Sequence, residues 1–320
     1  MRALVVTNMW PSPAAPARGS FVRDQVDALR RLPGLDVDVF VIGPKAYLSA
    51  PFALRRRHGH VDYDVIHAHF GLSAWPALAL RGAPHAVTLH GTDVRHPRTG
   101  RLTRAVLPAL DLVATVSAAL DAELGPRGGR RRAVLPCGVA TDRFRPMPRA
   151  EARRRLGLDP AEPCLLFPAD PARAGKRHDR ALEVAGTTPL HVLSGVDPAD
   201  VPLWVNAVNA VVFPTEAEGF GLAVLEALAC DVPVLATPVG VHPVALDGIT
   251  GTLCALYDPG TWRAAVAPHL EDPDPRIEGR ARAALFGADR MAERVAAAWG
   301  ELTGAPLYSR PEAPPGAVVT

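Results

Sequence analysis

The sequence lacks any apolar run long enough to span a membrane. A transmembrane helix needs about 18 consecutive apolar residues or more, and none of the 320 residues begins such a run. At the N-terminus, the short apolar run of MRALVVTNMWP ends at Pro11, so we expect no secretory signal. These absences favour a cytoplasmic protein.

Cysteine is scarce, and neither sign of charge dominates. The four cysteines, at positions 137, 164, 230 and 254, do not have the spacing of a metal site, so we expect no metal and a reduced, cytoplasmic chain. The formal net charge of +2 is too balanced to indicate nucleic acid as a partner. Hydrophobic residues make up 48% and charged residues 21%, which is typical of a globular protein, and the length suffices for two domains.

Short apolar runs alternate with helical stretches through the first part of the chain. Ser20 is a candidate N-cap for the first helical stripe, SFVRDQVDALRRL. Strands that are apolar throughout are expected where helices cover both faces of a parallel sheet. The expected strands span 2–7, 37–42, 64–69, 85–90, 112–117 and 132–137.

A second alternation of the same kind follows a joint rich in Pro and Arg at 143–163. The sequence therefore predicts a first Rossmann-like domain over 1–145 and a second over 146–287, with a final amphipathic helix over 288–304 and a disordered tail over 305–320. The expected strands of the second domain span 164–169, 190–194, 209–214, 233–237 and 251–255, and its expected helices span 176–185, 201–206, 221–230 and 260–270.

The stretch EGFGLAVLEALAC, at 218–230, places one carboxylate inside an apolar helix. Helical spacing puts Glu226 on the face of Leu222 and Ala229, and the remaining faces are apolar, so the helix is expected to be buried all round. A buried carboxylate needs partners. Glu226 therefore caps a loop, pairs with an arginine, or binds a ligand such as a ribose diol.

The start of this helix has the features of an anion site. Gly219 and Gly221 allow close approach of backbone amides, and a helix N-terminus favours negative charge. We expect a diphosphate at the amides of Phe220, Gly221 and Leu222, where Glu218 can accept hydrogen bonds from a sugar hydroxyl.

These stretches resemble the retaining GT-B glycosyltransferases of the family-4 type. The segment EGFGLAVLEALACDVPVLATPVG is similar to their nucleotide-sugar-binding segment, and ARGSFVRDQVDAL, DVIHAHFG, LHGTDV, LPCGVATDRFRP and PADPARAGKRHDRALE match other family segments in order. The resemblance implies an α/β fold of two Rossmann-like domains facing across a cleft. It also implies a C-terminal helix that crosses back to the first domain.

The resemblance also implies roles for individual residues. Glu218 would contact the donor sugar, and Glu226 would hold the ribose. Arg173 and Lys176 would neutralise the diphosphate in place of a metal. Two residues of the first domain complete the site by resemblance: Gly19 would approach the donor phosphate, and His90 would lie beside the reacting sugar.

The sequence departs from the family pattern in three places. Arg173 and Lys176 are three residues apart rather than five, and Cys137 replaces the usual Asn at the domain joint. The second domain also lacks a helix and strand that the family normally has between LHVLSG and DVPLWVNAVNAVVFP.

The expected function is retaining, metal-independent transfer of a sugar from a nucleoside diphosphate sugar to an unidentified hydroxyl acceptor, which is a glycan, a lipid-linked molecule or a small molecule. No other cofactor is expected. A non-catalytic or degenerate nucleotide-sugar-binding partner of another transferase remains an alternative, as does a nucleotide-sugar epimerase on the same fold.

Several other features have simpler readings. His67 and His69 are expected to be satisfied polar groups at a sheet edge, and 153–155, an arginine run, is expected to lie on a solvated face. The segment 47–60 combines apolar residues with three arginines. It is either a solvated helix end or a peripheral contact with the inner face of the membrane.

Overall fold

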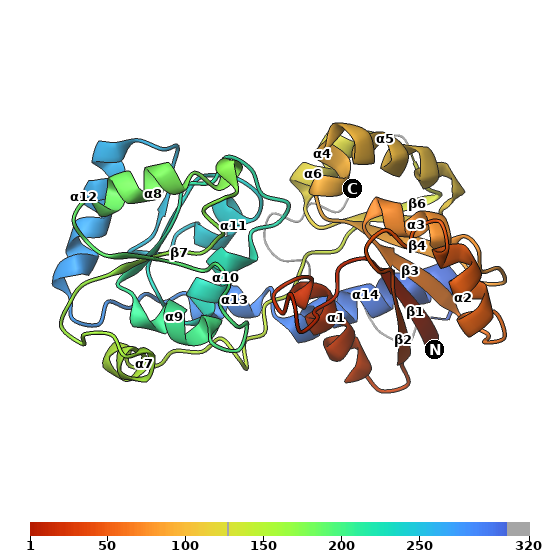
Figure 1. The fold of residues 1–320 in the computed structure, drawn as a ribbon, viewed down its shortest axis with the longest axis horizontal. Helices are drawn as coiled ribbons and strands as arrows, with labels where there is room; N and C mark the ends of the chain where they lie inside the picture. Colours follow the sequence, from red (N-terminus) through yellow and green to blue (C-terminus); the bar gives the residue numbers. More distant parts are fainter. Residues whose placement is uncertain (127, 306–320) are drawn as a thin grey trace. The chain divides into compact units, whose positions relative to one another are not determined.

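The structure is a computed structural model that describes residues 1–126 and 128–305. The chain forms two compact units: unit 1 combines residues 1–138 with the segment from Ala288 onward, and unit 2 spans 139–287 (Figure 1). Apart from Ala305, the predicted disordered tail at 305–320 lies outside the described residues. Each helix of the described ranges is too short or too polar to traverse a lipid bilayer.

Unit 1 is built on a six-stranded parallel sheet with the strand order β2-β1-β3-β4-β5-β6. The strand order reverses at β1, since β2 lies on one side of it and β3 on the other. The strands are β1 (Arg2–Thr7), β2 (Asp36–Val41), β3 (Val65–His69), β4 (His85–Leu89), β5 (Leu112–Thr115) and β6 (Arg131–Val134).

The helices of unit 1 lie on both faces of this sheet, which explains the continuous apolar strands (Figure 1). They are α1 (Ser20–Arg30), α2 (Ala50–His58), α3 (Gly71–Ala77), α4 (Thr92–Arg95), α5 (Pro97–Val106), η1 (Leu107–Ala109), α6 (Ala118–Leu124) and α14 (Ala288–Thr303).

The last helix, α14, belongs to unit 1, as the crossing helix implied by the resemblance would. In Figure 1 it lies beside α1 and the first strands. Met291, Val295 and Trp299 recur every four residues on one face of α14, and all three are buried in a core shared with α1. Truncation of a buried tryptophan costs about 3–5 kcal/mol, so α14 contributes substantially to the stability of unit 1.

Unit 2 contains a five-stranded parallel sheet with the order β11-β10-β9-β7-β8. The chain reverses direction across this sheet at β7, whose neighbours are β8 and β9. The strands are β7 (Leu165–Phe167), β8 (Leu190–Val192), β9 (Ala210–Phe213), β10 (Val234–Ala236) and β11 (Leu253–Cys254). The helices are α7 (Arg149–Leu156), η2 (Ala174–Lys176), α8 (His178–Ala185), α9 (Val201–Ala207), α10 (Leu222–Ala229), α11 (His242–Leu246), α12 (Pro259–Glu271) and α13 (Arg280–Ala284).

The shortened connection in unit 2 leaves β8 at an edge of the sheet. Residues 193–200 lead from β8 directly to α9, with no strand between them. All three residues of β8 are only half-buried, in contrast to the buried β7 and β9.

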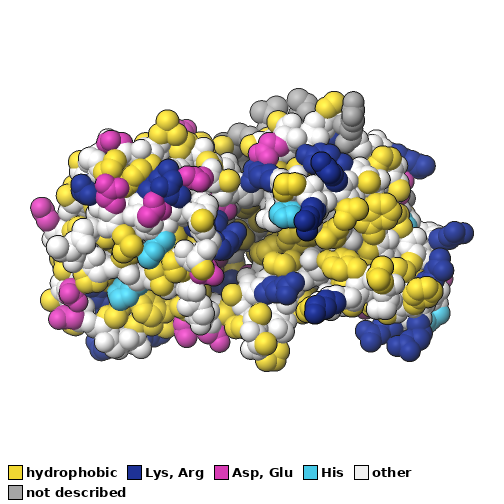
Figure 2. Space-filling view, turned by 45° about the horizontal axis from the view of Figure 1, so that its top comes forward, with side chains coloured by type: hydrophobic (Ala, Val, Ile, Leu, Met, Phe, Trp, Pro, Cys, Tyr) yellow, Lys and Arg dark blue, Asp and Glu magenta, His cyan; other side chains and the backbone are white. Residues whose placement is uncertain are grey.

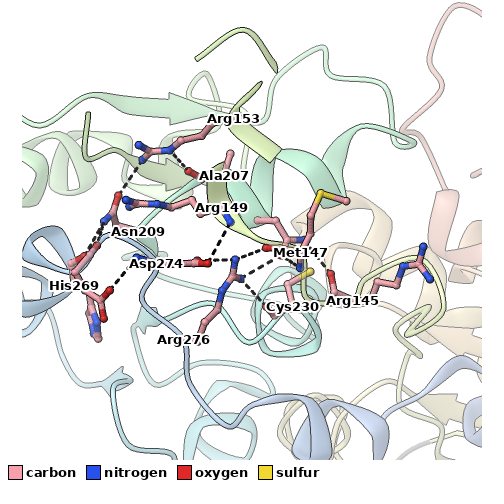
Figure 3. Close-up of polar contacts among 12 residues, drawn as sticks. Arg145, Met147, Arg149, Arg153, Ala207, Asn209, Cys230, His269, Asp274 and Arg276 are labelled. Atoms are coloured by element: carbon pink, nitrogen blue, oxygen red, sulfur yellow. Dashed lines mark hydrogen bonds and ion pairs between the residues drawn. The ribbon is translucent and has the colours of Figure 1, made fainter. Parts of the chain in front are cut away.

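The predicted joint at 143–163 is fixed to unit 2 by a buried arginine, and the expectation of a solvated face at 153–155 is wrong for Arg153. This side chain is fully buried, and it donates hydrogen bonds to Ala207 O at 2.7 Å and to Asn209 Oδ1 at 3.1 Å (Figure 3). It also donates to the carbonyl oxygens of Asp159 and Pro160. Helical phase explains the inward direction, because Arg153 shares a face with the buried Arg149 and Ala152, four and one residues before it, whereas the next two arginines are exposed.

A second arginine also holds the segment 143–163 to unit 2. Arg276 donates to Cys230 O at 3.0 Å and pairs with Asp274 at 2.9 Å (Figure 3). It also donates to the carbonyl oxygen of Met147, whose amide donates to Asn206 Oδ1 at 2.9 Å. The segment before α7 is therefore part of the folded core of unit 2 rather than a free linker.

Candidate functional site

The candidate donor site lies in the loops that follow β7 and β9 in unit 2. In an open parallel sheet, ligands bind at the carboxyl ends of the strands where the strand order reverses, and β7 and β9 flank that point. The loop after β7 contains Arg173 and η2, and the loop after β9 contains Glu218 and leads into α10. The topology therefore brings the two predicted motifs together.

The two loops are joined by an ion pair between the two most buried charges of the site. Lys176 Nζ donates a hydrogen bond to Glu218 Oε1, and their side chains are only 9% and 12% exposed. The ammonium group also lies over the ring of Phe213, 4.9 Å from its centroid. Burial lowers the pKa of Lys176, and the Glu218 carboxylate opposes part of that shift.

Backbone and hydroxyl contacts hold the same two loops at a fixed separation. Glu216 N donates to Gly175 O at 2.9 Å, and Thr215 Oγ1 donates to the same oxygen at 3.1 Å. Thr215 is fully buried, so this clamp is shielded from water. The position of Lys176 relative to Glu218 is thus set by the backbone of both loops.

Helix α10 begins at a glycine that no other residue could replace without strain. Gly221 has φ of +106°, and a Cβ atom there would lie 2.5 Å from Nε2 of His242. The amides of Phe220 and Gly221 donate no hydrogen bond within the described part of the chain, and the amides of the first helical turn lack partners in any α-helix. The predicted anion site is therefore formed by amides that can still donate hydrogen bonds to an anion.

The histidine beneath Gly221 is neutral. His242 is fully buried, and its Nδ1 lies 2.8 Å from Thr237 O, which can only accept, so Nδ1 carries the proton. Burial lowers the pKa of His242. Its Nε2 atom makes no hydrogen bond to any described residue.

The expectation that α10 is buried all round is wrong on one side. Leu222, Ala223 and Glu226 are half-buried, whereas the other residues of the helix are fully buried. These three positions are spaced i, i+1 and i+4, so they form a partly open strip along the helix. Glu226 lies on this strip, where solvent or a ligand can reach it.

Arg173 is less well placed than Lys176 for its predicted role of neutralising a diphosphate. Its side chain is exposed and makes no hydrogen bond or ion pair with the residues that the structure describes. It lies near enough to Lys176 to contribute to the lowered pKa of that lysine. The loop after β7 therefore has one buried and one exposed cation.

In unit 1, Gly19 and His90 lie in loops at the carboxyl end of the sheet. Gly19 precedes α1 with φ of +71°, and a Cβ atom there would lie 2.3 Å from the backbone carbon of Met9. Phe21, two residues later, packs against His90 with ring centroids 5.0 Å apart. Phe70 lies on His90 as well, with ring centroids 4.6 Å apart.

A buried aspartate fixes the loop that carries His90. Asp93 Oδ1 accepts hydrogen bonds from the amides of His90 at 3.0 Å and Gly91 at 2.8 Å, and Oδ2 accepts from Gly71 N at 3.3 Å. Burial raises the pKa of Asp93. The carboxylate thus ties the loops after β3 and β4 together.

His67 and His69 are satisfied polar groups, but the expected sheet edge is wrong, because β3 lies in the interior of the sheet. Both side chains are fully buried. His69 Nδ1 lies 3.0 Å from His90 Nε2, and His67 accepts a hydrogen bond from Trp299 Nε1 at 2.8 Å. Over residues 1–126 and 128–305, no group of three or more His, Cys, Asp or Glu side chains could hold a metal ion.

The two halves of the chain match two family models. Residues 2–143 match the model described as Glycosyltransferase Family 4, and residues 171–272 match the model described as Glycosyl transferases group 1. A D-inositol 3-phosphate glycosyltransferase from Actinosynnema mirum is 30% identical, and the match covers 80% of this chain and 76% of that protein. The chain belongs to the family-4 glycosyltransferases.

Solved glycosyltransferase structures share the fold. Sucrose-phosphate synthase from Thermosynechococcus elongatus has a TM-score of 0.74 at 21% identity, covering 95% of this chain and 99% of the other. HepE from Anabaena, solved in complex with UDP-glucose, has a TM-score of 0.71 at 15% identity, covering 94% and 100%. The α/β fold with two parallel sheets is thus the GT-B fold, as the resemblance implied.

The structure groups the predicted site residues of this family-4 glycosyltransferase by unit. One group lies together in unit 2: Arg173, Lys176, Glu218, Gly219, Phe220, Gly221, Leu222 and Glu226. Gly19 and His90 lie in unit 1. Sequence reasoning missed Thr215, which donates to Gly175 on the other loop, and His242, which lies against Gly221 at the start of α10. It also did not connect Gln25 with His69, which lie in different elements.

Proposed function

We propose that unit 2 binds a nucleoside diphosphate sugar and that the enzyme transfers its sugar to an acceptor hydroxyl with retention of configuration. The observation that carries this proposal is the buried pair of Lys176 and Glu218 beside the N-terminus of α10. A cation, free amides and a carboxylate acceptor together match a diphosphate joined to a sugar.

The charges of the site suggest how the diphosphate leaves. Lys176 and the start of α10 supply fixed positive potential where negative charge develops as the sugar–phosphate bond breaks. Arg173, being exposed, is free to approach the phosphates once they are bound. We propose that these groups take the place of a metal ion.

We assign the two carboxylates to different parts of the donor. Glu218 leaves Lys176 in part and accepts a hydrogen bond from a hydroxyl of the sugar, while Lys176 turns to the diphosphate. Glu226 binds the ribose diol from the open strip of α10, where it is accessible. In unit 1, His90 contacts a hydroxyl of the reacting sugar.

The relatives suggest which substrates to test first. HepE is described in complex with UDP-glucose, and the relative from Actinosynnema mirum is named as acting on D-inositol 3-phosphate. A panel of UDP, GDP, ADP and dTDP sugars should be screened by thermal shift, because a ligand that binds only the folded state raises Tm. Phosphorylated and free inositols, sugars and lipid-linked acceptors are then added to the best donor.

Two substitutions distinguish the assigned roles. Glu226→Ala should weaken binding of both the donor and the nucleoside diphosphate, whereas Glu218→Ala should lower kcat more than it weakens nucleoside diphosphate binding. Glu183→Ala, a half-exposed glutamate on α8 that pairs with Tyr257, is a control expected to change neither. Equal and small effects of the first two substitutions would refute these roles.

The product distinguishes the remaining alternatives. A retaining transferase forms a glycoside with the anomeric configuration of the donor, as NMR of the product would show, and it releases nucleoside diphosphate without added metal in the presence of a chelator. A non-catalytic binding partner would show saturable binding without turnover, and an epimerase would change the donor sugar without an acceptor.

We further propose that unit 1 contacts the surface of an anionic membrane through α2 and the loop before it. Leu48 and Phe52 are 91% and 75% exposed, and Lys45, Arg56 and Arg57 are exposed in the same segment. On the face drawn in Figure 2, the charged side chains of unit 1 are mostly Lys and Arg and lie among many apolar ones, whereas both signs of charge are mixed over unit 2. Apolar side chains beside basic ones suit an interface with acidic lipids.

A further inference from the structure

A buried chain of hydrogen bonds connects helix α1 to His90. Gln25 Nε2 lies 3.3 Å from His69 Nε2, and His69 Nδ1 lies 3.0 Å from His90 Nε2. Gln25 and His69 are 6% and 0% exposed. Water therefore cannot exchange freely with this chain, and each nitrogen depends on the partner that the protein provides.

Each imidazole in the chain is uncharged. Burial lowers the pKa of His69 to about 3, and burial also lowers the pKa of His90 well below its usual range. A neutral imidazole has one N–H donor and one lone-pair acceptor. The tautomer of one ring therefore dictates the tautomer of the next ring in the chain.

The amide of Gln25 sets the direction of the chain. Its nitrogen has only hydrogens to offer, so Nε2 of His69 accepts, and the proton of His69 is on Nδ1. His69 Nδ1–H then donates to Nε2 of His90, so the proton of His90 is on Nδ1. A reversed amide would instead present its oxygen to His69 and invert both rings.

We propose that Gln25 is a positioning residue that fixes the tautomer of His90 through His69. His90 then offers an Nδ1–H donor. Nδ1 makes no hydrogen bond to any described residue, so the donor is available to a ligand. This inference rests on the proposed function in one respect, which is that His90 faces a substrate oxygen. His90 would then donate a hydrogen bond to that oxygen and would not take up its proton at Nδ1.

The tautomer of His67 provides an internal control for the tautomers of His69 and His90. Trp299 Nε1 can only donate, so Nδ1 of His67 accepts at 2.8 Å, and the His67 proton is on Nε2, which lies 2.8 Å from Thr88 Oγ1. The His67 and His69 rings are stacked, with centroids 5.1 Å apart and 8° between their planes. His67 shares no hydrogen bond with Gln25, so its tautomer should not respond to changes at Gln25.

The test is NMR of the full chain labelled with ¹⁵N-histidine, in which long-range ¹H–¹⁵N correlations distinguish Nδ1–H from Nε2–H tautomers. Signals are assigned with His67→Asn, His69→Asn and His90→Asn. The wild type should show Nδ1–H for His69 and His90, and Nε2–H for His67. An Nε2–H tautomer of His90 in the wild type would overturn the proposal.

Two variants test whether Gln25 determines the tautomers of His69 and His90. In Gln25→Glu the ionised carboxylate can only accept, so both His69 and His90 should change to Nε2–H while His67 stays unchanged. In Gln25→Met, which removes the donor with little change of volume, His90 should lose its single tautomer. If His90 keeps only Nδ1–H in Gln25→Met, or in a folded Gln25→Glu, the proposal is wrong.

Kinetics separate this inference from the proposed function. Gln25→Glu should lower kcat about tenfold, the effect of one lost hydrogen bond, and should leave the affinity of unit 2 for nucleoside diphosphate unchanged. Expected tautomers without any donor turnover would refute the proposed function alone. Unexpected tautomers in an active transferase would refute this inference alone.

Discussion

Lys176 and Glu218 form a buried ion pair that joins the loops after β7 and β9 of unit 2. Two residues with separate predicted roles, one for the diphosphate and one for the sugar, are therefore bonded to each other. The pair compensates two buried charges, and a bound donor would have to replace that compensation with charge of its own.

The charge of Lys176 should depend on Glu218. Burial lowers the pKa of Lys176 and the carboxylate partly restores it, so Glu218→Gln should lower that pKa further, while a bound nucleoside diphosphate should raise it. The chain has only two lysines, so ¹³C-methylation followed by NMR titration resolves both, with the exposed Lys45 as reference. An unchanged Lys176 titration in Glu218→Gln would show that the ion pair does not form in solution.

The stability of unit 1 should fall in weakly acidic solution. His67 and His69 have pKa values far below 6.5 because they are buried, and the value for His69 is about 3. Below pH 6.5 the unfolded chain binds protons that the folded chain does not, so the free energy of unfolding rises with pH and is lost as pH falls. Two such groups contribute together about 3 kcal/mol per pH unit within this window.

Denaturation in urea at several pH values between about 4.5 and 7.5 measures this slope. His69→Asn should have a slope smaller by about 1.4 kcal/mol per pH unit, whatever its absolute stability. His96, which is exposed at the start of α5, provides the control substitution His96→Asn. Identical slopes for wild type and His69→Asn would contradict a neutral, buried His69.

The strands of both sheets could be predicted from the sequence because they are buried on both faces. Runs such as RALVVT and AVVF have a continuous apolar character, so β1 matches its predicted range and the other strands begin within two residues of theirs. Helix α14 begins at the predicted residue and ends one residue before the predicted end, because its apolar stripe continues over four turns.

The contacts within the site could not be predicted in the same way. The motif at 218–226 indicates an anion site, but the pairing of Lys176 with Glu218 depends on loops 42 residues apart in sequence. The burial of Arg153, by contrast, could have been predicted from its position on the buried face of helix α7. The run of three consecutive arginines suggested a solvated face instead. The partial exposure of Glu226 was missed because the helix has an apolar composition although one strip of it is only half-buried.

Binding to vesicles should test the proposed membrane contact of unit 1. Leu48→Ser and Phe52→Ser should weaken sedimentation with vesicles that contain acidic lipids, and Arg56→Glu should weaken it by about fivefold or more at low salt. Leu256→Ser is a matched control, because Leu256 is 80% exposed on unit 2. Equal binding to neutral and acidic vesicles, or an equal effect of Leu256→Ser, would contradict this contact.

Replacement of Arg153 should destabilise unit 2 although the charge is retained. Arg153→Lys keeps a cation but cannot reach the carbonyl oxygens of Ala207, Asp159 and Pro160 at once, so buried acceptors lose their donors at a cost of about 3 kcal/mol. Arg155→Lys is the matched control, because Arg155 is exposed and, among the described residues, pairs only with Glu151 on the same helix, a contact worth less than about 1 kcal/mol. Thermal unfolding should show a Tm several degrees lower for Arg153→Lys than for Arg155→Lys. Equal Tm values would mean that the joint at α7 is not part of the core of unit 2.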